Sequence, residues 1–490
     1  MDTLFPLAPF EQYMLQDDRA EYPMVFFLRL KFHGLLDQAT FKNSLDRVAG
    51  RHPLLQSVVR TVDGVACWTP AEDPTPFLSW ESSDKPIDRA AAGPNDLTQR
   101  TGLRAWVRTS AANTSVLLEF HHTCCDGIAA MQFIEDLLTA YNNEVAARNP
   151  ATARENSRPM RPLAPSKLRD RAGFGLTLVK KILRAPLGVS AAVGLGQFFV
   201  NRPAAVAVPA MQLNTEPPEN GLACVSHRFG RAQLDQLREI AHRLGVTVND
   251  LMVRDLLSTV EQWNRRNDPK SGACVRVSVP VNLRLKSDDQ LPAANVVSMV
   301  FVDRKPRSFR SPLRMLRSIR RDTWIIKKFR MGLVFNSVLA LLARFQGALA
   351  SMLITNRCMA SAVLSNLGPQ LDLAPLPRQR GRIDLGDATL DEIEFMPPIR
   401  PFTRMALGVV TYGGDLTVSV QYDANCLTSA SATNFLANYA ATLTSTATGH
   451  RDQIAAPTFA PRPVRGWNLR GFRPSAAQTA AAMVSRYAEI

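Results

Sequence analysis

A strand, a tight turn and a helix follow one another between Ser115 and Tyr141, and this order constrains the fold more than any other stretch of the chain. Residues 116–120 form a short apolar run with one charge, as expected of a buried strand. Apolar side chains then recur at helical spacing, at Ile128, Met131, Ile134, Leu138 and Tyr141. Asp126 and Gly127 stand where a capping side chain and a small residue are favoured. The sequence therefore predicts a strand that ends in a tight turn at the start of a helix.

Two histidines, His121 and His122, stand at the end of this strand, where a base can be held at the mouth of the turn. A histidine in such a place is usually structural, and Asp-Gly before a helix is usually a cap. A Cys–His nucleophile is a third interpretation, because Cys124 is two residues from His122 and could share its face of a strand. Cys124 and Cys125 are equally explained as small buried residues. The local pattern alone leaves these alternatives open.

The pattern His-His-x-x-x-Asp-Gly, formed by His121, His122, Asp126 and Gly127, resembles the signature of a large superfamily of CoA-dependent acyltransferases. That superfamily contains chloramphenicol acetyltransferase, the condensation domains of nonribosomal peptide synthetases, wax ester synthases and polyketide-associated acyltransferases. The resemblance is nearest to members similar to wax ester synthases, polyketide-associated acyltransferases and alcohol acyltransferases. It implies that His122 is a general base and that His121 is a packing and orienting residue. It also implies that Asp126 is a structural residue whose carboxylate pairs with a distant arginine.

Later motifs follow in the order that the superfamily leads us to expect. Asn249 and Asp250 precede a predicted helix, and they resemble an Asn-Asp pair of wax ester synthases that either caps the helix or supports the site. Arg284 ends a predicted strand over 274–284 and is the expected partner of Asp126, since a carboxylate and a guanidinium can bond bidentately. An exposed turn arginine is the alternative.

Two further motifs carry polar groups that suit a site or a turn. Ser365 and Asn366, in Ser-Asn-Leu-Gly-Pro, resemble the Ser-Asn turn of the same families, where they would help to orient the acceptor or the tetrahedral intermediate. The same residues also favour a turn that has no catalytic or binding role. His52 lies in an Arg-His-Pro turn, and we interpret it as structural because a residue before proline is held in an extended conformation.

The length of 490 residues favours two domains over one continuous core. The resemblance implies an α/β (α+β) fold of two chloramphenicol-acetyltransferase-like halves, with mixed sheets, that meet along a central tunnel. We assign residues 1–150 to the N-terminal half, 151–220 to a linker or crossover and 221–450 to the C-terminal half. We expect residues 451–490 to be a mobile tail.

Further elements follow from apolar periodicity and turn residues. We predict strands over 24–32, 55–61, 103–108 and 225–229, helices over 37–50, 232–244, 251–264 and 429–443, and a hairpin around Gly413-Gly414. The apolar segment 331–354 contains Asn336 and Arg344, which favours a packed or amphipathic helix over a membrane span. Segment 174–201 is interpreted either as a membrane-surface helix or as a crossover between domains.

The seven cysteines form no Cys-x-x-Cys pair, which favours a reducing compartment over a disulfide framework or a structural zinc site. The N-terminus lacks the basic start of a secretory signal, so the cytoplasm is the expected location, with contact to a membrane left open. The formal net charge of +15 suits coenzyme A phosphates, an acidic carrier protein or an anionic membrane surface equally well. The basic residues are scattered and accompany no nucleic-acid module, so nucleic acid is not expected as a partner.

The resemblance implies that a thioester donor and a hydroxyl or amine acceptor meet at His122. Our leading hypothesis is direct transfer from acyl-CoA to a small hydroxyl acceptor, without an acyl-enzyme, without a metal and without a permanently bound cofactor. The donor thioester of coenzyme A or phosphopantetheine is then a co-substrate. Condensation of groups carried on a carrier protein is the closest alternative, and a non-catalytic scaffold that binds a carrier is the second. A histidine base must be neutral, so activity is expected to fall below pH 6.

Overall fold

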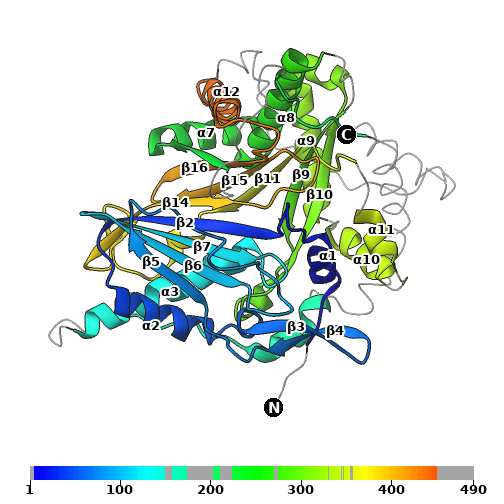
Figure 1. Ribbon diagram of the computed structural model, residues 1–490. Coiled ribbons are helices and arrows are strands. Elements are labelled where there is room, and N and C mark those ends of the chain that lie inside the picture. Colours follow the sequence, from blue (N-terminus) through cyan, green and yellow to red (C-terminus); the bar gives the residue numbers. More distant parts are fainter. Residues whose placement is uncertain are drawn as a thin grey trace, which may run out of the picture.

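The computed structural model describes residues 5–148, 157–173, 202–209, 223–269, 274–328, 330, 332–343, 345, 347–353 and 357–449 (Figure 1). Within these ranges two layered α/β bodies lie against each other. The first part of the chain forms most of the lower body in Figure 1, and the later part forms the upper one. Helices cover the outer side of each sheet. This is the mixed α/β architecture of two halves that the resemblance implies, so the predicted fold class is confirmed.

A five-stranded mixed sheet organises the N-terminal half. Its order is β14-β2-β7-β6-β5, with β2 (Val25–Gly34), β5 (Phe77–Ser82), β6 (Leu103–Thr109), β7 (Asn113–His121) and β14 (Ala388–Met396). Only β5 and β6 are parallel neighbours in this sheet. Alternate residues of a strand face the same side, so Phe26, Leu28 and Leu30 of β2 share one buried core with α2 (Gln38–Ala49) and α3 (Gly127–Ala147).

Smaller elements complete this half. A second sheet has the order β1-β4-β3, with β1 (Phe5–Pro6), β3 (Ser57–Val62) and β4 (Val65–Pro70), and α1 (Pro9–Asp17) follows β1. A third, two-stranded sheet is formed by β12 (Arg378–Gln379) and β13 (Arg382–Ile383). Short 3-10 helices occur along the whole described chain: η1 (Pro53–Gln56), η2 (Pro165–Gly173), η3 (Lys286–Asp288), η4 (Pro306–Arg310) and η5 (Gln370–Leu373).

A six-stranded sheet organises the C-terminal half. Its order is β10-β9-β11-β15-β16-β8, with β8 (Cys224–Phe229), β9 (Val275–Asn282), β10 (Val297–Arg304), β11 (Ala362–Gly368), β15 (Met405–Tyr412) and β16 (Asp415–Tyr422). Its helical layer consists of α7 (Arg231–Leu244), α8 (Val248–Asn267), α9 (Pro312–Lys328) and α12 (Ser429–Ala447). Two short helices, α10 (Gly332–Leu342) and α11 (Ala348–Leu353), lie beside α1.

Strand β14 lies late in the chain but belongs to the N-terminal sheet. It pairs with β2, from Ala388 opposite Gly34 to Met396 opposite Phe27. Its outer side contacts β15 and β16 of the other sheet. Our sequence-based division places this segment in the C-terminal half, and the apolar pattern did not predict the strand. The two halves are thus joined by a shared strand as well as by the chain that connects them.

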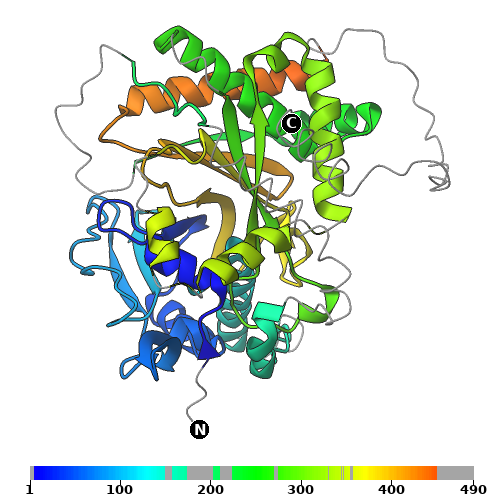
Figure 2. The ribbon, with the colours of Figure 1, turned by 90° about the vertical axis from the view of Figure 1, so that its right-hand side faces the viewer.

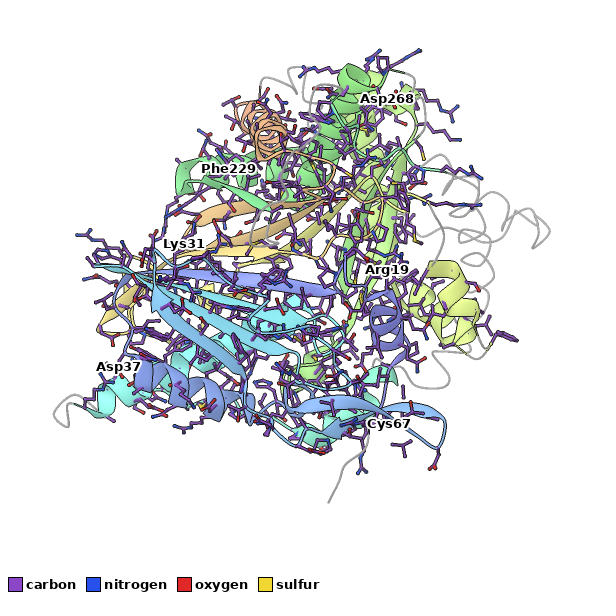
Figure 3. The ribbon with its side chains drawn as sticks, in the orientation of Figure 1. Arg19, Lys31, Asp37, Cys67, Phe229 and Asp268 are labelled. Carbon is purple, nitrogen blue, oxygen red and sulfur yellow. The ribbon has the colours of Figure 1, made fainter. Side chains whose placement is uncertain are left out.

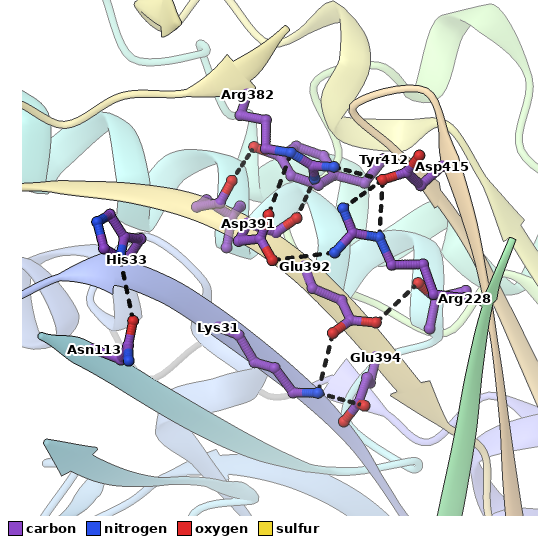
Figure 4. A network of polar contacts seen from close by, with 12 residues as sticks. Lys31, His33, Asn113, Arg228, Arg382, Asp391, Glu392, Glu394, Tyr412 and Asp415 are labelled. Atoms are coloured by element: carbon purple, nitrogen blue, oxygen red, sulfur yellow. Dashed lines mark hydrogen bonds and ion pairs between the residues drawn. The ribbon is translucent and has the colours of Figure 1, made fainter. Parts of the chain in front are cut away.

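Charged side chains tie the same region together (Figure 4). Lys31 of β2 donates hydrogen bonds to Glu392 (3.0 Å) and Glu394 (2.7 Å) of β14. Arg228 of β8 donates to Asp391 of β14 (3.1 Å) and pairs with Asp415 of β16. In Figure 3, Lys31 and Arg19 are labelled at opposite ends of the region where the two halves meet. Ion pairs therefore connect the N-terminal sheet with β8 and β16 of the C-terminal sheet.

Most of the predicted elements are present. The helices expected over 37–50, 232–244 and 429–443 correspond to α2, α7 and α12, and the hairpin at Gly413-Gly414 joins β15 to β16. Segment 331–354 forms two short helices where we expected one, with Gly347 in a left-handed conformation between them (φ 76°). None of the described helices combines the length and apolar character that a membrane crossing requires. The interpreted segments 174–201 and 451–490 lie outside the described residues.

Replacing Gly408 with alanine is expected to lower the free energy of unfolding. A Cβ atom at Gly408 of β15 would lie 1.9 Å from the carbonyl oxygen of Phe395 on β14. Overpacking a core typically costs about 1–3 kcal/mol, and a clash with backbone lies at or above the upper end of that range. Urea unfolding checks this, with Gly50→Ala as the control, since a Cβ there meets its nearest atom at 3.4 Å. Equal midpoints for Gly408→Ala and wild type would contradict the proposed close approach of the two sheets.

Candidate active site

Residues of both halves hold His122 through hydrogen bonds to its backbone amide and carbonyl. β7 pairs with β2 so that His121 lies opposite Val25, and the turn begins at His122. The His122 amide donates to the carbonyl of Met24 (2.7 Å). The His122 carbonyl accepts from the side-chain amide of Asn295 (2.6 Å). Met24 of the N-terminal half and Asn295 of the C-terminal half therefore hold the same residue from two directions.

The His122 ring forms part of the wall of a cavity between the two halves. It packs edge-on against Phe26, with 5.2 Å between the ring centroids. Nδ1 is buried without a hydrogen bond of ordinary geometry to a described residue, which leaves Nε2 as the nitrogen that can meet a ligand. Burial lowers the pKa of His122, and nearby backbone groups and the Asp126 carboxylate oppose this only in part. The ring is therefore neutral near pH 7 and can accept a proton.

Both halves line the cavity, and most of its wall is apolar. The apolar wall includes Met14, Met24, Ile128, Val297, Met299 and Phe395. Polar groups from Asn282, Arg284, Ser365 and Asn366 also reach it. An apolar cavity with a few convergent polar groups and a buried base is typical of a small-molecule site. His122 thus lies at a cavity whose wall comes from both halves.

Asp126 both caps α3 and forms the predicted pair with Arg284. Its Oδ1 accepts from the amide of Ala129 (3.0 Å), and its Oδ2 accepts from Arg284 Nη1 (2.7 Å) and from the amide of Val296 (2.8 Å). The two side chains are only 3% and 8% exposed. The guanidinium does not bind the carboxylate bidentately, because Arg284 Nη2 donates to the carbonyl of Ala294 (2.9 Å). The pair thereby joins the histidine turn to the loop before β10.

His121 is buried and does not line the cavity. Its Nδ1 accepts from the amide of Thr123 (3.2 Å), so the proton of the neutral ring lies on Nε2, which is 3.4 Å from Asp18 Oδ2. The other carboxylate oxygen of Asp18 accepts from the amide of Met24 (2.7 Å). Asp18 therefore contacts two residues that adjoin His122. The sequence analysis missed Asp18, because no local pattern marks it.

Ser365 and Asn366 line the cavity at the end of β11. The register of β11 against β15 shifts between Asn366 and Gly368, so Leu367 is an extra, bulged residue. Bulges commonly redirect side chains beside active sites. The amide of Asn366 donates to Asn249 Oδ1 (3.3 Å), whereas Asn249 itself is not part of the cavity wall. The structure thus brings the predicted residues together, with Asn249 behind Asn366.

The start of α8 differs from the sequence-based expectation. Thr247 is the N-cap, and its hydroxyl accepts from the amide of Asp250 (3.1 Å). The Asp250 carboxylate in turn accepts from the amide of Thr247 (2.8 Å). Of the two roles left open for this pair, Asp250 takes the capping one, because a threonine and an acidic residue three positions apart form a reciprocal capping box, although the N-cap itself is Thr247. Asn249 is therefore free of a capping role and contacts Asn366.

Two glycines allow the close packing of the histidine turn. A Cβ on Gly127 would lie 2.6 Å from Leu367 Cδ2, the bulged residue of β11. A Cβ on Gly102 would lie 2.5 Å from Cys124 Sγ and 2.8 Å from His121 Cβ. Gly127 was predicted from the motif, whereas Gly102 was missed because it stands just before β6, outside the motif. Both positions require a small residue for the turn to meet its surroundings.

The two cysteines of the turn do not fit a nucleophile. Cys124 and Cys125 are fully buried and absent from the cavity wall. Burial raises the pKa of both thiols far above the ordinary value. A thiol that stays protonated and cannot reach the cavity is a poor nucleophile. The geometry therefore favours their interpretation as small core residues over the Cys–His alternative.

His52 is placed as the sequence analysis expects of a structural residue. Its Nδ1 accepts from the amide of Ala293 (2.8 Å), and its Nε2 lies 3.5 Å from Asp136 Oδ2. The side chain is 1% exposed, and burial lowers its pKa. Within the described ranges no cluster of three or more His, Cys, Asp or Glu side chains could hold a metal ion. His52 thus links α3 to the segment that carries Ala294 and Asn295.

Comparisons of the sequence with known proteins include the histidine turn in their matched range. Residues 110–252 match the wax ester synthase/diacylglycerol acyltransferase catalytic domain. An uncharacterized protein of Mycobacterium tuberculosis is 23% identical over 466 residues, which cover 90% of this chain and 100% of that protein. The isonitrile lipopeptide synthase of the same organism is 31% identical over 147 residues, which are 28% of this chain but only 6% of the synthase.

Comparisons of the fold extend over almost the whole chain. The first condensation domain of the calcium-dependent antibiotic synthetase, in complex with a substrate analogue, has a TM-score of 0.62 at 16% identity, over 93% of this chain and 99% of that one. A mutant starter condensation domain of rhizomide synthetase, in complex with C8-CoA and Leu-SNAC, has a TM-score of 0.61 at 13% identity, over 93% and 98%. The comparisons support acyl transfer as the general chemistry. The sequence match across the histidine turn and the shared fold both support the superfamily of CoA-dependent acyltransferases and condensation domains as the one that this chain resembles.

Proposed function

We propose that this protein transfers an acyl group from a thioester, with acyl-CoA as the favoured donor, to the hydroxyl group of a small acceptor. The observation that carries the proposal is the position of His122, whose ring lines an apolar cavity between the two halves. Its lowered pKa supplies a neutral imidazole near pH 7. A cavity that holds donor and acceptor beside one base converts a bimolecular encounter into a positioned attack.

His122 acts as the general base in this mechanism. Nε2 takes the proton of the acceptor hydroxyl while the oxygen attacks the thioester carbonyl carbon and a tetrahedral intermediate forms. The carbon–sulfur bond then breaks, and the imidazolium returns the proton to the departing thiolate. No acyl-enzyme is formed. The charge on the intermediate's oxygen needs a polar neighbour, and Ser365 and Asn366 are the polar residues of β11 at the cavity.

Condensation of groups presented on a carrier protein is the second candidate. Its support is the fold shared with condensation domains and the sequence likeness to the isonitrile lipopeptide synthase. The same base would serve an amine acceptor, so an amide in place of an ester product belongs to this candidate. Phosphopantetheine then replaces coenzyme A as the carrier of the thioester, and an acidic carrier protein becomes a partner. A scaffold that only binds such a carrier is the non-catalytic alternative.

A matched comparison of donors and acceptors tests the proposal. The full chain is incubated with acyl-CoA or with the same acyl group on a holo-carrier protein, each with a pool of alcohols and a pool of amines. We expect thiol release from acyl-CoA that depends on the alcohol, with the ester identified by mass spectrometry. Turnover with the holo-carrier donor alone would favour condensation. Thiol release no greater than that of His122→Ala with every donor would favour the scaffold.

The rate of acyl transfer is expected to fall only at distinctly acidic pH. Burial lowers the pKa of His122 below its ordinary value of about 6.5. The unprotonated base is therefore fully present at pH 7, and it is lost as the pH falls through the lowered pKa. The decline that we expected below pH 6 from the sequence thus moves to lower pH. Measurement of kcat/KM between about pH 8 and pH 4.5 checks this, and an acidic limb at or above the ordinary histidine pKa would contradict it.

A further inference from the structure

Three helices lie on one side of the molecule, which faces the viewer in Figure 2. They are α9, α10 and α11, and we call their outward surface, over residues 312–353, the α9–α11 face. It carries both exposed cations and exposed large apolar side chains. Neither feature contributes to the site of His122, so each needs its own explanation.

The first feature is the charge of α9. Its exposed cations are Arg314, Arg317, Arg320, Arg321, Lys327 and Lys328. The one acidic residue of the helix, Asp322, is 4% exposed and is held by Arg304 and Arg321. The outer side of α9 therefore presents positive charge without an exposed carboxylate of its own. Such a surface favours an anionic partner.

The second feature is exposed apolar surface. Seven large hydrophobic side chains are well exposed among the described residues, and three of them lie within 324–345. Trp324 is 51% exposed, Leu341 54% and Phe345 62%. Helix α10 has no charged residue in its 11 positions. Leu341 and Phe345 stand close together at the end of α10, and exposed apolar surface of this kind marks an interaction site, whereas isolated exposed residues need no explanation.

The inner side of these helices connects the face to the cavity. Phe335 and Leu339 of α10 and Leu349 of α11 belong to one apolar cluster with Tyr13, Met14 and Met24. Tyr13, Met14 and Met24 also form part of the cavity wall. In addition, Arg19 donates to the carbonyl of Leu353 at the end of α11 (2.6 Å). Helices α10 and α11 therefore cover one side of the candidate active site.

We propose that the α9–α11 face docks on the surface of an anionic lipid bilayer. The bilayer supplies phosphate groups for the cations of α9 and an apolar layer for Trp324, Leu341 and Phe345, and basic apolar helices bind at this boundary. An acidic carrier protein would match the cations but would leave the apolar side chains unexplained. Docking here would bring the cavity next to the membrane, so that an apolar substrate could enter it without crossing water.

Vesicle co-sedimentation of the full chain tests the proposal without any substrate, so its result is independent of the proposed function. We expect binding to vesicles of phosphatidylcholine and phosphatidylglycerol in equal amounts and much weaker binding to phosphatidylcholine alone. Neutralising one cation typically reduces binding about fivefold, so Arg314→Gln/Lys327→Gln should reduce it about 25-fold. Leu341→Ser/Phe345→Ser should also release the protein, and this loss should persist at low salt.

The matched control is Lys42→Gln/Arg47→Gln, which removes the same charge from α2, at a distance from the α9–α11 face in Figure 1. Its binding should stay within about twofold of wild type, because charges beyond a Debye length are screened. Circular dichroism confirms that each variant is folded. Absence of wild-type binding, or equal loss in the control, would overturn the proposal. Binding to an acidic carrier protein that depends on Arg314 and Lys327, without vesicle binding, would replace it with a protein partner.

Discussion

Replacing His122 with alanine is expected to reduce kcat by about a hundredfold to ten-thousandfold, the usual contribution of a general base. The ring lines the cavity, and its backbone is held by Met24 and Asn295, so the substitution removes the imidazole while the turn keeps its hydrogen bonds. Donor binding should stay nearly intact, because the apolar wall is unchanged. Steady-state rates of thiol release, with donor affinity from calorimetry, check both parts of the expectation.

The control for this substitution is His33→Ala, which removes an exposed histidine of β2. It should turn over like wild type. Comparable turnover in His122→Ala would refute the role of His122 as the base, and a matching loss of donor affinity would assign it to binding. If His122→Ala still forms the ester at a normal rate, the catalytic group would have to be sought among the other polar residues of the cavity wall, such as Ser365 and Asn366.

Replacing Arg284 with methionine is expected to destabilise the protein by about 3–5 kcal/mol, the typical cost of removing one partner of a buried ion pair. The Asp126 carboxylate would stay buried with only the amides of Ala129 and Val296 as partners. The histidine turn should lose its connection to the loop before β10. A displaced base lowers kcat, by about tenfold to a hundredfold. Chemical unfolding and steady-state kinetics measure the two effects.

A double-mutant cycle separates the pair from general damage. Asp126→Asn/Arg284→Met removes both charges and should recover part of the stability lost in the single variants, because neither charge is then left unpaired. Arg60→Met, on the exposed side of β3, serves as the control and should change stability by no more than about 0.5 kcal/mol. Additive losses across the cycle would show that Asp126 and Arg284 act independently, contrary to their 2.7 Å contact.

The parts of the site that the sequence predicts are those with local signals. The apolar run before His121 and the helical spacing after Asp126 specify a strand, a turn and a helix, and the structure contains all three. The pair of Asp126 with Arg284 was expected from the order of motifs, since no spacing rule joins residues this far apart. The geometry of that pair, with one contact instead of two, depends on the carbonyl of Ala294 and could not be predicted.

The parts that the sequence does not predict depend on contacts between distant segments. Asp18 reaches His121, about a hundred residues later, only once the chain is folded, so its own neighbourhood in the sequence carries no sign of this contact. The bulge at Leu367 is visible only once β11 is paired with β15. Strand β14 has an apolar pattern mixed with Glu392 and Glu394, because these carboxylates bind Lys31 across the sheet. Tertiary pairing, not local propensity, decides such elements.

Strand β14 also limits how far the two halves can move apart. β14 is hydrogen-bonded along β2 and packs against β15 at Gly408, so separating the halves would either detach β14 from β2 or expose the surface that β14 buries against β15 and β16. An N-terminal fragment without β14 would leave β2 as a bare edge, which is prone to aggregation. Motion between the two halves is therefore expected to be smallest along β14.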